Sequence, residues 1–82
     1  MTADDINAGC AQQFDIWCER RSARPLRHLL SAWPLTNGLT DDWGNLYEAL
    51  RGLRANCRED ISEAELVHVE DLIRAIAAFL QQ

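Results

Sequence analysis

Apolar residues recur at three- and four-residue intervals in three separate stretches of this chain, and this spacing constrains its fold more than any other feature. Such intervals bring each apolar side chain to the same face of an α-helix. The three stripes are Ile6, Cys10, Phe14 and Trp17; Trp43, Leu46, Leu50, Leu53 and Cys57; and Leu66, Val69, Ile73, Ile76 and Leu80. Each stretch is therefore predicted to be an amphipathic helix.

Polar residues before each stripe predict where these helices begin. Thr2 and Thr40 are suitable N-caps, and acidic residues follow both of them, where they complement the helix dipole. Ser62 is followed three residues later by Glu65, which is the pattern of a capping box. We therefore expect helices to start after Thr2, Thr40 and Ser62.

The two prolines predict a fourth, shorter helix between the first two stripes. We expect the first helix to end near Ser22, and Pro25 suits the first position of a new helix. This short helix should stop just after Trp33, where Pro34 follows. The Asn37-Gly38 pair predicts a turn in the loop that comes next.

Three longer helices and one short helix predict an all-α fold, a small helical bundle formed by a single domain over residues 1–82. The simplest packing is an antiparallel three-helix core with the short helix capping one end. Leu72, Ala77 and Phe79 widen the last stripe, which suits a helix with neighbours on two sides. A core of this size supplies only about 3–5 kcal/mol of net stability, so self-association or a binding partner is expected.

Composition predicts a cytoplasmic protein without a membrane segment. No apolar run approaches the roughly 18 residues needed to span a bilayer, and the N-terminus is acidic where a secretory signal would be basic. The three cysteines Cys10, Cys18 and Cys57 are an odd number without a C-x-x-C pair, which fits reduced thiols. Cys10 and Cys57 lie on apolar stripes and are expected in the core.

The sequence offers no arrangement of residues that predicts catalysis, a metal site or a cofactor. His28, His68 and the three cysteines lack the two-to-four-residue spacing of structural zinc ligands. Neither histidine stands in a motif with a nucleophile or carboxylate, and a chain this short has little room for a substrate cleft. We therefore expect neither an enzyme nor a small-molecule substrate.

The net charge of −5 is unevenly distributed along the chain. Residues 1–19 carry four acids and no base, residues 20–40 carry four arginines and no acid, and residues 41–82 carry nine acids and four arginines. An acidic protein repels phosphate backbones as a whole, so direct nucleic-acid binding is disfavoured. The four arginines are more suited to an acidic protein surface.

Tryptophan together with arginine is the combination most enriched at the energetic centres of protein interfaces. Trp17 and Trp43 lie on core stripes, whereas Trp33 stands beside Pro34 where a small domain cannot easily bury an indole. We therefore predict a partner-binding surface in this region. Its candidate residues are Arg20, Arg21, Arg24, Arg27, Trp33 and Leu35.

These observations favour a protein-interaction module: a small regulator, inhibitor or adaptor that docks onto a protein complex. Small size and acidity are also common in phage counter-defence and bacterial immunity proteins, which is an analogy of composition only. Two alternatives stay open. One is a nucleic-acid-linked role, by mimicry of a phosphate backbone or through the Arg20–Arg27 elbow; the other is a structural homodimer whose last helix packs against its copy.

Overall fold

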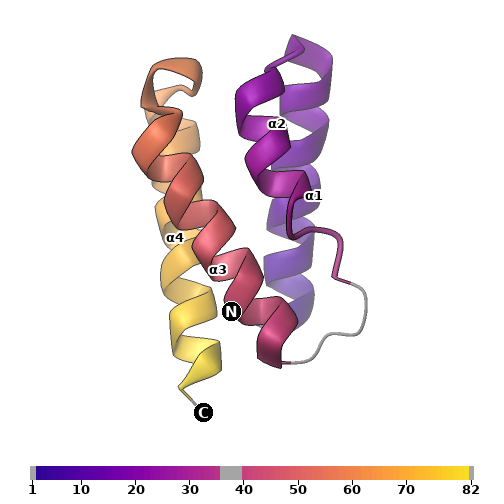
Figure 1. Cartoon of the computed structure of the whole chain (residues 1–82), viewed down its shortest axis with the longest axis vertical. Helices are drawn as coiled ribbons and strands as arrows, with labels where there is room; N and C mark the ends of the chain where they lie inside the picture. The colour runs from indigo at the N-terminus through magenta and orange to yellow at the C-terminus, as the bar shows by residue number, and fades with distance from the viewer. Residues whose placement is uncertain (1, 36–39, 82) are drawn as a thin grey trace.

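Four α-helices and one short 3-10 turn make up the computed structural model, which describes residues 2–35 and 40–81. The helices are α1 (Ala3–Arg20), α2 (Ala23–Leu30), α3 (Thr40–Asn56) and α4 (Glu63–Leu80), with η1 (Arg58–Asp60) between the last two. Successive helices run in opposite directions, so that both ends of the chain lie at the same end of the bundle (Figure 1). The all-α prediction, with three longer helices and one short one, is confirmed.

The predicted helix starts at Thr2 and Ser62 are confirmed in detail. The Thr2 hydroxyl accepts a hydrogen bond from the Asp5 backbone N–H, and the Asp5 carboxylate accepts one from the Thr2 backbone. Ser62 and Glu65 form the same reciprocal pair at the start of α4. At α3 the helix already includes Thr40, and the predicted cap through its side chain lies outside what is described, as does the turn at residues 37–38.

The bounds of α2 differ from the prediction at both ends. The helix begins at Ala23, which makes Pro25 its third residue rather than its first. Proline is tolerated there because the first N–H groups of a helix have no partner in any case. The helix ends at Leu30, three residues before Trp33, and the N–H of Trp33 donates to the Leu29 carbonyl at 3.0 Å.

The short helix does not cap one end of a three-helix core, and this expectation is wrong. α2 packs against α1 and α3, while α4 packs against the same two helices from the other side. Only two residues, Arg21 and Ser22, separate α1 from α2, so the chain must fold straight back along α1 (Figure 1). The four helices therefore form a bundle in which each helix packs against two others, and α2 is about half as long as the other three.

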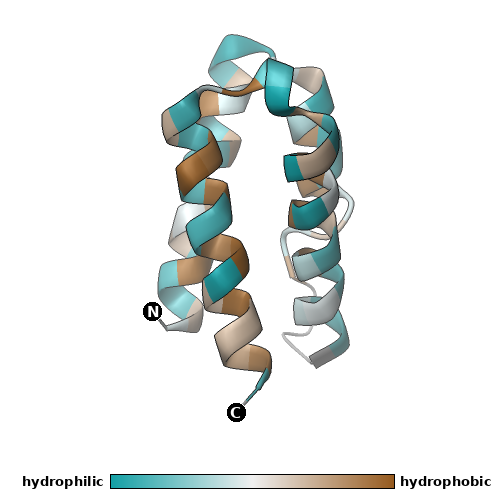
Figure 2. Cartoon of the chain, turned by 90° about the vertical axis from the view of Figure 1, so that its left-hand side faces the viewer, coloured by the Kyte–Doolittle hydropathy of each residue, from teal (hydrophilic) through white to brown (hydrophobic). Residues whose placement is uncertain are grey.

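The predicted stripes form the core between these helices. Apolar residues recur along α4 to its last turn (Figure 2), and α4 contacts both α1 and α3, which confirms the expectation drawn from its wide stripe. Trp17 and Trp43 are buried, and so are Cys10 and Cys57. The full set of buried apolar residues is Ile6, Cys10, Trp17, Leu29, Trp43, Leu46, Leu50, Leu53, Cys57, Val69, Leu72, Ile73 and Ile76.

α1 and α4 approach each other closely at Gly9. A Cβ atom at this position would lie 2.7 Å from Leu72 Cδ2 and 3.2 Å from His68 Nε2. One turn along α1, the buried Gln13 places its Nε2 atom 2.5 Å from His68 Nδ1. His68 therefore belongs to the packing between α1 and α4, and Gly9 is required by that packing.

Candidate protein interface

Trp33 lies in the segment that follows α2. Its indole packs against α1, with its ring centroid 5.8 Å from that of Phe14 and its Nε1 donating to Asn7 Oδ1 at 3.3 Å. The side chain is half-buried, in contrast to the fully enclosed Trp17. Trp33 therefore differs from the two core tryptophans, as predicted, because its side chain is only partly buried.

Leu30, at the last position of α2, extends this surface and was not among the predicted residues. Its side chain is 48% exposed, whereas the adjacent Leu29 is buried. The two leucines are neighbours in sequence and point about 100° apart on a helix, so only one of them can face the core. Two adjacent leucines on a helix with one buried face could have predicted that one of them would be exposed to solvent.

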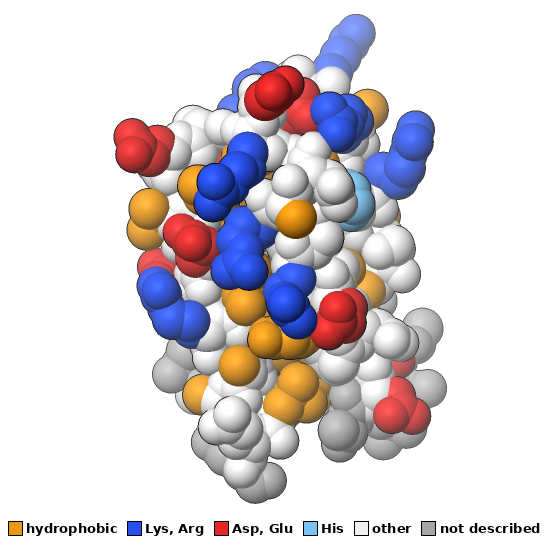
Figure 3. Space-filling model, turned by 60° about the vertical axis from the view of Figure 1, so that its left-hand side comes forward, with side chains coloured by type: hydrophobic (Ala, Val, Ile, Leu, Met, Phe, Trp, Pro, Cys, Tyr) orange, Lys and Arg blue, Asp and Glu red, His pale blue; other side chains and the backbone are white. Residues whose placement is uncertain are grey.

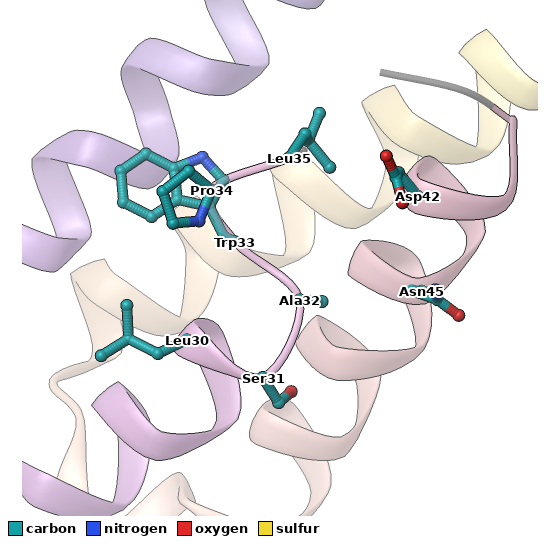
Figure 4. Close-up of a pocket in the computed structure, with 8 residues that line it drawn as sticks. All are labelled: Leu30, Ser31, Ala32, Trp33, Pro34, Leu35, Asp42 and Asn45. Atoms are coloured by element: carbon teal, nitrogen blue, oxygen red, sulfur yellow. The ribbon is translucent and has the colours of Figure 1, made fainter. Parts of the chain in front are cut away.

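A pocket of about 360 Å³ opens where α2 stops (Figure 4). The segment 31–35 lines one side, with Trp33 and Pro34 joined by a cis peptide bond, and Asp42 and Asn45 of α3 line the other. Trp33 points from this segment toward α1 (Figure 4). The end of α2 thus presents a pocket lined by apolar side chains on one side and by the polar Asp42 and Asn45 on the other.

Arg20 is bound within the chain rather than presented to a partner. Its guanidinium holds the Glu65 carboxylate through two contacts, of 2.6 and 2.8 Å, and also donates to the Asp60 carbonyl at 3.0 Å. Trp17 Nε1 donates to the same carboxylate at 3.0 Å. Hydrogen bonds from Arg20 are the main reason that the pKa of Glu65 falls from 4.5 to about 2, although burial acts in the opposite direction.

Arg24 has a similar internal role at the same end of the bundle. Its guanidinium donates to the Asn56 carbonyl at 2.7 Å and lies 3.2 Å from the Asp60 carboxylate. Because Asn56 and Asp60 flank the connection between α3 and α4, this arginine ties the start of α2 to that connection. Arg20 and Arg24 together hold the elbow between α1 and α2 in place.

Arg21 and Arg27 are exposed, and within the described part of the chain neither side chain has an ion pair or a hydrogen bond. Arg21 ends α1 in the left-handed conformation, with φ of 58° and ψ of 41°. Arg27 lies on α2 three residues before Leu30, so the two side chains are neighbours on the helix surface.

The six predicted site residues therefore fall into two groups. Arg20 and Arg24 stabilise the elbow, and Arg21 lies beside them at the end of α1. Arg27, Trp33 and Leu35 lie along and beyond α2, and Leu30 joins them. We call the set Arg27, Leu30, Trp33 and Leu35 the α2-end surface.

Of the three free cysteines, Cys10 and Cys57 are buried and Cys18 is exposed. Burial raises the pKa of Cys10 to about 12, so its thiol stays protonated at neutral pH. Among residues 2–35 and 40–81 no three histidine, cysteine or acidic side chains are grouped so that they could hold a metal ion. No helix in these ranges is long and apolar enough to cross a membrane. Neither a family model nor a curated protein nor a solved structure matches the chain.

Proposed function

We propose that this protein is a small protein-interaction module, acting as a regulator, inhibitor or adaptor that docks onto a partner protein through the α2-end surface. The observation that carries the proposal is the exposure of Leu30 beside the half-buried Trp33. Exposed leucines are common on their own, but apolar groups that cluster with a tryptophan and an arginine are typical of binding surfaces.

Charge suggests which partner chemistry this surface would accept. Arg27 is the basic group on α2 that borders Leu30, and no acidic side chain in the described residues neutralises it. A partner segment with an apolar side chain and a neighbouring carboxylate would bury Leu30 and pair with Arg27. We therefore propose an acidic, partly apolar segment of another protein as the ligand.

Two observations support this class over the alternatives. Arg20 and Arg24 are bound to groups of the same chain, so only part of the Arg20–Arg27 elbow remains to contact phosphates. The apolar stripe of α4 is covered by α1 and α3, so it does not call for a second copy of the helix. We also propose a cytoplasmic location, because Cys10, Cys18 and Cys57 are unpaired thiols.

The proposal can be tested with two matched substitutions. Leu30 and Val67 are both large exposed apolar residues, at 48% and 52% exposure, but Val67 lies on α4 away from the α2-end surface. The proteins bound by the tagged chain in a lysate of its native host would be compared with those bound by Leu30→Asp and Val67→Asp. Each bound protein would then be purified and titrated calorimetrically against all three chains.

We expect Leu30→Asp to weaken binding at least about tenfold, because a buried carboxylate has no partner at an apolar contact. Val67→Asp should bind like the unaltered chain. Circular dichroism would verify that both variants keep their helix content. Equal binding by all three chains, or equal loss in both variants, would remove the α2-end surface as the docking site.

A further inference from the structure

The solvent face of α3 carries a charge pattern that changes sign along the helix. Its acidic residues lie near the start and its basic residues near the end, and the turn that follows adds one more arginine. The residues of this surface, which we call the α3 face, are Asp41, Gly44, Glu48, Arg51, Ala55 and Arg58. All are exposed except Gly44, which is half-buried.

This pattern is complementary to itself when one copy is turned round. In an antiparallel pair of helices, residues at equal distances on either side of a two-fold axis face each other. An axis midway between Glu48 and Arg51 places Glu48 opposite the second copy's Arg51. It also brings Asp41 to the end of the second copy's α3, where Arg58 follows in η1. A parallel pair would instead place equal charges against each other.

We propose that two copies of this chain associate through the α3 face, antiparallel about a two-fold axis between Glu48 and Arg51. The same axis places Gly44 opposite the second copy's Ala55. Helix axes pack about 8–10 Å apart depending on the side chains at the contact, and these two small residues allow the close end of that range.

Gly44 supplies an independent reason to expect contact at this face. A Cβ atom there would have no neighbour within 4 Å among the other described side chains, so packing within the chain does not require a glycine. Glycine inside a helix costs about 1 kcal/mol relative to alanine. Gly44 also lies on the wall of a shallow hollow of about 680 Å³, which is lined by Asp41, Gly44, Asn45, Tyr47, Glu48 and Leu80.

Arg51 of this surface is already held near its position. Arg51 lies 3.6 Å from the Glu48 carboxylate and 5.5 Å from the centre of the Tyr47 ring. Arginine side chains gather on the side formed by α3 and α4, with apolar side chains below them (Figure 3). In the dimer, the two intrachain Glu48–Arg51 pairs, one in each copy, are exchanged for two pairs across the axis. Because charged groups dominate, the association should be weak and sensitive to salt.

Paired charge reversals test this arrangement directly. Arg51→Glu with Arg58→Glu makes the α3 face acidic, and Asp41→Arg with Glu48→Arg makes it basic. Sedimentation velocity would be measured on each chain and on a 1:1 mixture, at concentrations up to about 1 mM, where weak dimers are detectable. We expect the unaltered chain to dimerise, each variant alone to lose at least about tenfold in affinity, and the mixture to form heterodimers.

Controls separate this surface from net charge and from the α2-end surface. Arg21→Glu with Arg27→Glu, and Asp15→Arg with Glu19→Arg, change the net charge equally at exposed positions elsewhere. These controls and Leu30→Asp should dimerise like the unaltered chain. A chain that stays monomeric at the highest concentration would overturn the proposal, and so would variants that associate unchanged or fail to associate when mixed.

Discussion

At the scale of single residues, Glu65 shows how one buried carboxylate connects three parts of the chain. It caps α4 with Ser62, accepts a hydrogen bond from Trp17 in α1, and is held by Arg20 at the elbow. A carboxylate with this many donors is stabilised in its charged form, which explains its lowered pKa. Its contribution to folding should therefore depend on pH.

Glu65→Gln should lower the free energy of unfolding at neutral pH and flatten its dependence on pH. A pKa that falls from 4.5 to about 2 on folding corresponds to a contribution of roughly 3 kcal/mol. Because the folded pKa is the lower one, this contribution is present above pH 4.5 and is lost as the pH falls toward 2. Urea unfolding from pH 7 to pH 2 would measure it.

Glu63→Gln is the matched control, because Glu63 is exposed in the same turn of α4. It should keep the pH dependence of the unaltered chain. If Glu65→Gln had the same pH dependence as well, the Glu65 contacts would contribute little to stability.

The glycines of α1 and α3 lead to a second prediction, with opposite signs at two positions. Gly9→Ala should lower the free energy of unfolding by about 1 kcal/mol, because the new methyl group meets the buried Leu72. Gly44→Ala should raise it by about 0.5–1 kcal/mol, because its methyl group enters open space in a helix. Thermal unfolding at low protein concentration would measure both, and changes of the same sign would contradict this assignment.

At the scale of the elements, the role of the elbow between α1 and α2 could not be predicted from the sequence. Four arginines in a segment without acids suggested one basic surface, but two of them, Arg20 and Arg24, bind groups of the same chain that lie about 30 to 45 residues further along it. Only the fold brings these groups together. Helix starts at Thr2 and Ser62 were predictable because a capping box is local to four residues.

The arginines of the elbow should contribute unequally to stability. Arg20→Ala should lower the free energy of unfolding by about 2 kcal/mol, a figure reduced by solvent screening because this side chain is 41% exposed. Arg24→Ala should lower it by about 0.5–1 kcal/mol, and Arg27→Ala should leave it nearly unchanged. Urea unfolding of the three variants would measure these losses in the free energy of unfolding and rank them. Three equal effects would contradict the division of the site into two groups.

The placement of α2 shows the limit of prediction at this scale. Pro25 and Pro34 correctly indicated a short helix, but its bounds moved by two or three residues because proline fits anywhere in a first turn. α2 lies alongside α1 because only two residues connect them, and the sequence alone did not predict how short this connection is. Trp33 was recognised as unusual from its neighbours, whereas Leu30 became evident only when the orientation of α2 was known.

At the scale of the whole molecule, the unequal lengths of the helices account for the candidate interface. α2 has 8 residues, whereas α1, α3 and α4 have 17 or 18. At 1.5 Å per residue, α2 is about 12 Å long and ends roughly halfway along its neighbours. Trp33 and Leu35 pack against the core from the chain beyond it. The bundle therefore has an accessible apolar surface where one helix stops.

The central claim is that this surface serves binding and contributes much less to the stability of the fold than the core does. The most direct measurement is the free energy of unfolding of Trp33→Ala, compared with that of Trp43→Ala. Trp43 is 4% exposed, so its loss should cost about 3–5 kcal/mol, which equals the net stability expected of the whole core and should leave this variant largely unfolded. Trp33→Ala should unfold cooperatively within about 1.5 kcal/mol of the unaltered chain, since its indole is half-buried. A loss as large as that of Trp43→Ala would assign Trp33 to the core and contradict the claim.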